Sequence, residues 1–166
     1  MTSPLARLEP LAYDLLRMVA GFVFILHGVQ KFGFLGGTAV SLTSLIGLAA
    51  IIEVVGGTLI ALGLFTVPAA FIASGEMAYA YFFSHLPRGV WPVQNGGEPA
   101  ILYCFIFLFI AARGPGGISI DALLLRMKVS SRSRGNGMPP SITMPPALFA
   151  CIWITRCVLQ SLSNTA

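Results

Sequence analysis

Charge is the scarcest property of this sequence. Only 10% of the 166 residues are charged, whereas 56% are hydrophobic. A soluble domain carries about 25% charged residues, so this chain has too little polar surface to cover a water-facing globule. We therefore predict an integral membrane protein built as a single domain. The net charge of +4 is small and forms no basic stripe with interleaved aromatic residues, which argues against nucleic-acid binding.

Several chemical motifs are missing as well. The three cysteines form no C-x-x-C pair, which argues against a dithiol redox site, and Cys104 is expected to be a small packed side chain. No dinucleotide-binding glycine motif, P-loop or H-E-x-x-H motif is present, and we expect no metal site in this chain. The first apolar run contains Arg17 and has no small-residue cleavage site, so we expect no cleaved signal peptide.

Four long apolar runs are present, with lengths close to the ~20 residues that cross a hydrocarbon core of ~30 Å. We predict an all-α fold, a membrane four-helix bundle with short loops, in a domain covering residues 1–125. The expected helices span residues 11–30, 44–65, 67–85 and 98–112. The link at Thr66 to Pro68 is so short that the second and third helices should form an antiparallel hairpin.

The remaining segments are predicted to be loops and a tail. Residues 86–97 contain two prolines and three glycines, which exclude a continuous helix. Residues 118–125 suit a short surface helix. Residues 126–166 are predicted to be a basic, flexible tail. Within it, residues 147–159 are expected to lie at the membrane interface, and a fifth crossing is the alternative.

The basic residues predict the orientation. Arg7 precedes the first run, and a cluster beginning at Arg113 and Arg126 follows the fourth, whereas the loops on the other side carry only Lys31 and Arg88. Because cytoplasmic loops are enriched in lysine and arginine, both termini should be cytoplasmic. The predicted location is the cytoplasmic (inner) membrane, as a multi-pass protein.

Three ionisable residues, Arg17, Glu53 and Glu76, lie inside the apolar runs. A charge at the centre of a bilayer costs roughly 3 kcal/mol on insertion scales, so each needs a partner, a proton or water. We predict that Arg17 pairs with one or both glutamates. One arginine cannot neutralise two carboxylates, so one glutamate would be protonated or share a proton. These three are the candidate catalytic residues; an ion pair that only fixes helix register is the alternative.

Aromatic and histidine residues supply the candidate cofactor-binding positions. Tyr79, Phe83 and Tyr103 are predicted to line an apolar cavity for a quinone ring, with simple packing as the alternative. His27 and His85 both lie near the outer face, and two histidines on facing helices can hold haem. His85 lies about half a turn away from Glu76 on a continuous helix, so we do not expect haem. Interfacial polar positions, or a proton or quinol contact, remain open for both histidines.

An ordered set of motifs covers residues 10–125 and resembles the DoxX family of small bacterial membrane proteins. The motifs are LR (16–17), LHGVQKFG (26–33), IEVVGG (52–57), LGLFT (62–66), GEMAYAYF (75–82), NGGE (95–98), LYC (102–104) and GPGGISID (114–121). The resemblance implies a four-helix bundle in the cytoplasmic membrane. It also implies a link to quinone-coupled redox complexes, among them a subunit of thiosulfate:quinone oxidoreductase and a membrane partner of thiol and superoxide defence proteins. The motif positions worth testing are Arg17, His27, Lys31, Glu53, Glu76, Glu98 and Asp121.

Two classes of function follow from these observations. The first is a membrane subunit of a quinone-linked redox complex, an oxidoreductase component that receives electrons from a partner protein. The second is a non-catalytic membrane scaffold or a carrier of small solutes. Both need the lipid bilayer as their environment, neither involves nucleic acid, and a homo-oligomer is compatible with either.

Overall fold

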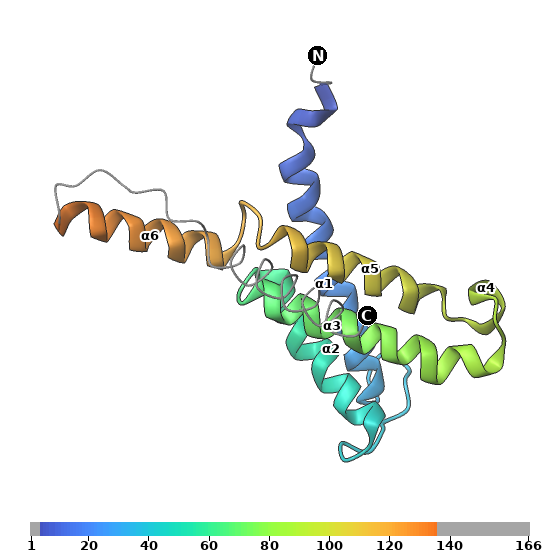
Figure 1. Cartoon of the computed structure of the whole chain (residues 1–166). Coiled ribbons are helices and arrows are strands. Elements are labelled where there is room, and N and C mark those ends of the chain that lie inside the picture. The colour runs from blue at the N-terminus through green and yellow to red at the C-terminus, as the bar shows by residue number, and fades with distance from the viewer. Residues whose placement is uncertain (1–3, 136–166) are drawn as a thin grey trace, which may run out of the picture. The chain divides into compact units, whose positions relative to one another are not determined.

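The computed structural model describes residues 4–135, and every regular element in that range is helical (Figure 1). The all-α prediction is therefore confirmed for the described part of the chain. The elements, in chain order, are η1 (Pro4–Arg7), α1 (Glu9–Lys31), α2 (Leu45–Leu62), α3 (Thr66–Ala80), the π-helix η2 (Tyr81–His85), η3 (Leu86–Arg88), α4 (Pro92–Asn95), α5 (Glu98–Arg113) and α6 (Ile120–Gly135).

The second helix ends at Leu62 rather than at residue 65, and the third changes to a π-helix at Tyr81. Local residues explain several of the observed boundaries. Ser44 caps α2 by accepting a hydrogen bond from the Gly47 amide, and Gly63 ends it in the left-handed conformation with φ +70°. Pro68 lies in the first turn of α3, where the missing amide hydrogen has no intrahelical partner. Glu98 begins α5 and places a negative charge at the positive end of the helix dipole.

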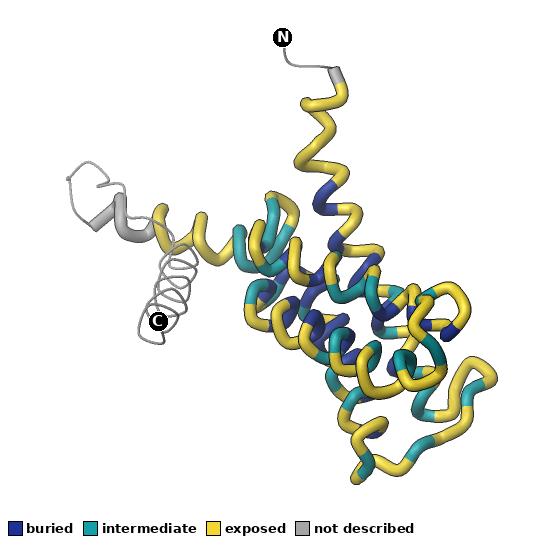
Figure 2. Tube along the Cα trace, turned by 45° about the vertical axis from the view of Figure 1, so that its right-hand side comes forward, coloured by how far each residue is buried: buried dark blue, intermediate teal, exposed yellow. Residues whose placement is uncertain are grey.

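The chain divides at Leu124 into two compact units, and α1, α2, α3 and α5 belong to the first. Helix α1 packs along α2, α3 packs along α5, and α2 also contacts α3. Figure 2 shows buried positions where these helices meet and exposed positions on their outer sides. The core is formed by Phe24, Ile60, Ala70, Ala73, Phe107 and Ile110, all fully buried.

Helices α1 and α2 approach each other through glycines. A Cβ added at Gly21 would lie 2.7 Å from the Gly57 oxygen, and one at Gly28 would lie 2.8 Å from the Ala50 oxygen. Small residues permit such backbone contact between helices in membranes. These pairs fix an antiparallel register in which Gly21 faces Gly57 and Gly28 faces Ala50.

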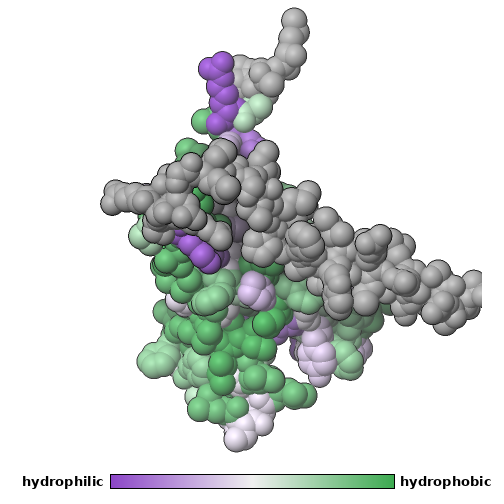
Figure 3. Space-filling view, turned by 60° about the vertical axis from the view of Figure 1, so that its left-hand side comes forward, coloured by the Kyte–Doolittle hydropathy of each residue, from purple (hydrophilic) through white to green (hydrophobic). Residues whose placement is uncertain are grey.

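Large apolar side chains stay exposed on the outer sides of the long helices, among them Phe22, Phe71 and Phe105. Figure 3 shows a broad hydrophobic face over this part of the molecule. Two helices within the described range, α1 with 23 residues and α2 with 18, are long and apolar enough to cross a membrane. Soluble proteins rarely expose contiguous apolar patches larger than a few hundred Å², so this exterior is typical of a membrane protein.

The basic tail differs from its prediction where it is described. Helix α6 continues to Gly135, so residues 126–135 are helical and the expectation of a flexible segment there is wrong. Arginine, lysine and methionine are good helix formers, and no proline occurs between Ile120 and residue 138 to stop the helix. Residues 136–166, including the predicted interfacial segment 147–159, lie outside the described residues.

Candidate functional site

A buried ion pair joins α1 to α2. The Lys31 Nζ lies 2.8 Å from the Glu53 Oε1, and the Glu53 side chain is only 3% exposed. Gly28 permits this contact because it has no side chain. A Cβ at this position would lie only 3.0 Å from the Glu53 Cβ, which is closer than an ordinary contact between two carbon atoms. The backbone of α1 therefore passes close to Glu53, and Lys31, one turn further along α1, reaches over it.

Glu76 completes a cluster of charge around this pair. It lies on α3 within electrostatic range of both Glu53 and Lys31. The Oε2 atoms of Glu53 and Glu76 are both buried and have no hydrogen-bond partner among the described residues. Two carboxylates and one ammonium thus meet in an apolar region, with two acceptor atoms left unsatisfied. A buried polar atom without a partner is costly and commonly marks a functional site.

Arg17 does not neutralise these glutamates, so the predicted pairing is wrong. It is fully buried and donates to three main-chain carbonyls instead: its Nη1 bonds to Ile60 and, at 2.8 Å, to Ala61, and its Nη2 bonds to Ile118. The register of α1 and α2 explains the difference. Arg17 lies opposite Ala61, about two helical turns, or roughly 12 Å, from the level of Glu53. Lys31, which the sequence analysis places in a loop, supplies the positive charge beside Glu53.

Tyr103 and His27 lie beside each other on α5 and α1. Their ring centroids are 5.9 Å apart and the rings meet edge to face. Tyr103 also stacks on Phe107 at 5.4 Å and contacts Phe24 at 5.9 Å. His27 is exposed, and it lies within electrostatic range of Glu53. The two residues therefore connect α5 to the charged cluster.

An apolar groove of about 340 Å³ runs between α1 and α5. Its lining residues are Leu16, Val19, Ala20, Val23, Glu98, Pro99, Leu102, Tyr103 and Ile106. The volume falls within the range of small-molecule sites. Only Tyr103 and Glu98 contribute polar side chains to the lining.

The predicted cavity of Tyr79, Phe83 and Tyr103 is not formed as one site. Tyr79 and Phe83 stack on each other at 4.3 Å, but both are exposed, at 46% and 67%. Neither lines the groove that contains Tyr103. Because the two residues are four apart on one helical face, their contact is local to that face.

His85 is half-buried rather than directed outward. Its Nδ1 lies 3.2 Å from the Asn95 carbonyl oxygen, so it contacts the segment around α4. The predicted half-turn offset from Glu76, which would point His85 away from the helix bundle, assumed a continuous α-helix. The segment η2 is instead a π-helix, whose wider turn changes the direction of the side chains that follow. Asn95 is itself buried, bonding to Gly89 and Gly97. His85 therefore anchors the loop.

At the other end of the helices, two acidic residues accept hydrogen bonds from main-chain amides. The sequence analysis predicts no structural role for either of them. Asp14 is 3% exposed and accepts from the Ile118 amide at 3.0 Å. Asp121 accepts from the Phe65 and Thr66 amides, each at 3.0 Å, and so caps α3. A sequence signal existed for Asp14, since it lies three residues before Arg17 and therefore shares its helix face.

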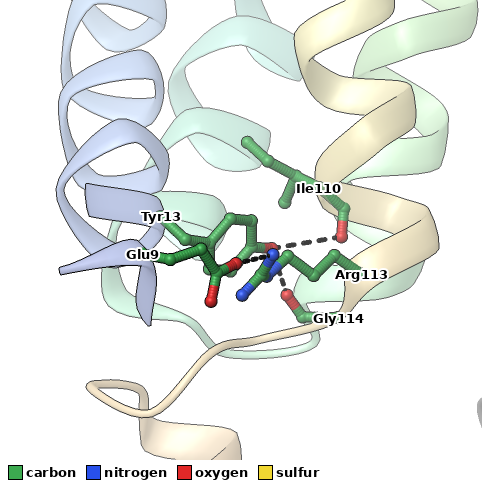
Figure 4. A network of polar contacts seen from close by, with 5 residues as sticks. All are labelled: Glu9, Tyr13, Ile110, Arg113 and Gly114. Atoms are coloured by element: carbon green, nitrogen blue, oxygen red, sulfur yellow. Dashed lines mark hydrogen bonds and ion pairs between the residues drawn. The ribbon is translucent and has the colours of Figure 1, made fainter. Parts of the chain in front are cut away.

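A second network of polar contacts lies at the same end of the helices and joins α1 to α5 (Figure 4). The Tyr13 hydroxyl donates to the Gly114 carbonyl, and the Arg113 guanidinium lies 4.3 Å above the Tyr13 ring. Glu9 pairs with Arg113. These contacts, with those of Asp14, Arg17 and Asp121, indicate that the segment 114–121 fastens the helix ends. Within residues 4–135, no three metal-binding side chains lie together as a metal ion would require.

Comparison with known proteins agrees with the motifs. Residues 12–86 match the family described as DoxX. An uncharacterized protein from Haemophilus influenzae (strain ATCC 51907 / DSM 11121 / KW20 / Rd) is 42% identical over 125 residues, which cover 70% of this chain and 93% of that protein. No solved structure matches. The chain therefore belongs to the DoxX family, a family of membrane proteins.

Proposed function

We propose that this chain is a multi-pass protein of the inner membrane with both termini in the cytoplasm. Helices α1, α2 and α5 and the continuous helical stretch from Thr66 to Arg88 would make four crossings. The exposed apolar side chains of these helices support this arrangement. The excess of basic residues on the proposed cytoplasmic side supports the orientation.

The function we propose is that of a membrane subunit in a quinone-linked redox complex. The observation that carries it is the cluster of Lys31, Glu53 and Glu76, with two buried carboxylate oxygens unsatisfied. One lysine balances one carboxylate, so the second restores neutrality by taking up a proton. Glu76 holds that proton and releases it when charge moves nearby, while Lys31 keeps Glu53 in place.

The quinone is the substrate of this complex, and the electrons come from a partner protein. A ring that dissolves in lipid can reach an apolar site without crossing water, and the groove beside Tyr103 has the apolar lining and the size for one ring. A quinone accepts electrons and protons together. The carboxylate cluster would therefore supply protons, a role that a purely structural ion pair does not have. Arg17 takes a structural part, since its nitrogens bind main-chain carbonyls.

The test is quinol formation by the purified protein together with the product of a neighbouring gene as electron-donating partner. We expect Glu76→Gln to lower the rate at least tenfold, because general acid–base groups commonly contribute about 10²–10⁴. Glu9→Gln is the matched control, since Glu9 is an exposed carboxylate outside the cluster. Difference infrared spectroscopy should show a protonated carboxyl band in the wild type that Glu76→Gln removes.

Equal rates for the wild type and Glu76→Gln would overturn the redox role. With the infrared band also absent, the cluster would be an ion pair that sets the register of α1 and α2. That outcome would support the scaffold or carrier interpretation of the sequence.

A further inference from the structure

We infer that the groove between α1 and α5 is the docking site of a quinone ring, with the Tyr103 hydroxyl as its hydrogen-bond donor and His27 as its link to Glu53. The inference rests on the proposed function and adds to it a place of binding and two residue roles.

The groove opens on the apolar outer side of the helices. Val19 is 58% exposed and Leu102 is 56% exposed, and both line it from opposite helices. Phe24 and Phe107 are fully buried and pack against each other at 4.6 Å behind Tyr103, so they give the site a rigid aromatic support. A ligand dissolved in lipid can enter sideways between Val19 and Leu102 and meet the Tyr103 ring.

Tyr103 gives the site its polarity. Within residues 4–135 its interactions are ring contacts with Phe24, His27 and Phe107, and its hydroxyl forms no hydrogen bond there. The hydroxyl of a partly buried tyrosine normally finds a partner. A ring carbonyl is an acceptor that fits this free donor, whereas an acyl chain offers none, so the groove suits a quinone ring better than a lipid tail.

His27 lies between Tyr103 and the charged cluster. Its ring meets Tyr103 edge to face, and it is within electrostatic range of Glu53, which pairs with Lys31 beside Glu76. Reduction of a quinone to a quinol takes two electrons, from the partner protein, and two protons. Both protons come from Glu76, which holds one proton at a time. Each proton passes by way of the Glu53 carboxylate to the His27 imidazole and on to the ring oxygen at Tyr103. Glu76 takes up a proton from water after each transfer, so the chain returns to its starting state.

The first experiment locates the ring by photolabelling. The purified full-length protein in lipid vesicles is irradiated with an azido-substituted benzoquinone, and labelled peptides are identified by mass spectrometry. We expect label on residues 16–23 and 98–106. Val19→Trp fills the groove and should reduce labelling at least tenfold, while Val55→Trp, the same change at an exposed position of α2, should leave it unchanged. Label confined to the segment of α3 and η2 that holds Tyr79 and Phe83, or equal labelling in both variants, would overturn the site.

The second experiment separates binding from proton delivery. Tyr103→Phe removes only the hydroxyl, so decylubiquinone affinity should fall about two- to tenfold, the effect of one hydrogen bond. His27→Gln should leave affinity unchanged and lower quinol formation at least tenfold. Unchanged affinity in Tyr103→Phe would refute the donor role, and unchanged turnover in His27→Gln would refute the link.

These results are distinguishable from failure of the proposed function. If Glu76→Gln lowers quinol formation but the label maps outside the groove, the redox role is supported and the docking site is refuted. If the label maps to the groove but Glu76→Gln has no effect on turnover, the groove binds quinone and the proton role of the cluster falls.

Discussion

Lys31 and Glu53 form an ion pair at 2.8 Å between the last turn of α1 and the middle of α2. The side chain of Lys31 is 31% exposed, whereas that of Glu53 is 3% exposed, so the lysine reaches inward from the end of its helix to a carboxylate that lies deep. The long aliphatic stem of lysine permits this, because it can stay in apolar surroundings while its ammonium group moves to a partner. The positive charge of a partly exposed lysine thus neutralises a carboxylate in the protein interior.

Replacing Lys31 by methionine should destabilise the protein by about 2 kcal/mol, because the change leaves the Glu53 carboxylate buried and unpaired. The magnitude is below that of a fully buried pair, since Lys31 is partly exposed. Thermal unfolding in detergent measures it. The double variant Lys31→Met, Glu53→Gln should be more stable than Lys31→Met alone, because no unpaired charge remains. Equal melting temperatures for the wild type and Lys31→Met would show that the pair contributes nothing to stability.

Arg17→Met should be among the most damaging substitutions in the chain. It would remove the donors of the Ile60, Ala61 and Ile118 carbonyls, and we expect a loss of roughly 3 kcal/mol or more. Arg17→Lys should recover only part of it, since one ammonium cannot reproduce the fork of a guanidinium. The measurement is the melting temperature, with Arg88→Met, an exposed arginine in η3, as the matched control. Full stability in Arg17→Lys would mean that charge alone matters at this position.

The contrast between Arg17 and Lys31 shows what the sequence can and cannot reveal. Run length and turn residues were enough to place the long helices, because twenty apolar residues and a glycine or proline at the end are local signals. The partners of Arg17 depended on the register of α1 against α2, which is set by contacts of Gly21 and Gly28. Arg17 lies about two helical turns from the level of Glu53, and its position inside an apolar run could not reveal this offset.

The same limit applies to His85 and Asp14. A π-turn is not visible in the residues YFFSH, so the direction of His85 could not be predicted from a helical wheel. Asp14 binds an amide of Ile118, more than a hundred residues later, and no local pattern encodes such a pairing. The presence of two glutamates inside apolar runs was evident from the sequence, but the cation that pairs with Glu53 was not.

The neighbouring glycines Gly56 and Gly57 offer a matched pair of substitutions. A Cβ at Gly57 would lie 2.7 Å from the Gly21 oxygen and 3.0 Å from the Ile25 nitrogen, whereas a Cβ at Gly56 meets nothing within 4 Å. Main-chain atoms cannot move aside locally, so Gly57→Ala should force α1 and α2 apart and cost about 2 kcal/mol. Gly56→Ala should be neutral or stabilise by up to about 1 kcal/mol, because alanine favours helix.

Thermal unfolding of both variants tests this prediction. Equal effects of the two alanines would indicate that α1 and α2 are not in the close contact described here. Under the proposed function, quinol formation is a second readout, since separating α1 from α2 would also pull Lys31 away from Glu53.

Asp121→Ala should destabilise the start of α3. The carboxylate accepts from the amides of Phe65 and Thr66, and from the Thr66 hydroxyl at 3.0 Å, so it acts as a cap supplied from a distant part of the chain. Loss of a helix cap costs about 0.5–2 kcal/mol, and the Phe65 residue, with φ +46°, would lose the contact that holds its unusual conformation. Asp121→Asn keeps an acceptor oxygen and should cost about half as much. Amide hydrogen exchange is the decisive measurement, because only the first turn of α3 should exchange faster in Asp121→Ala. Faster exchange spread evenly over all the helices would instead mean that Asp121 stabilises the whole fold and is not a local cap.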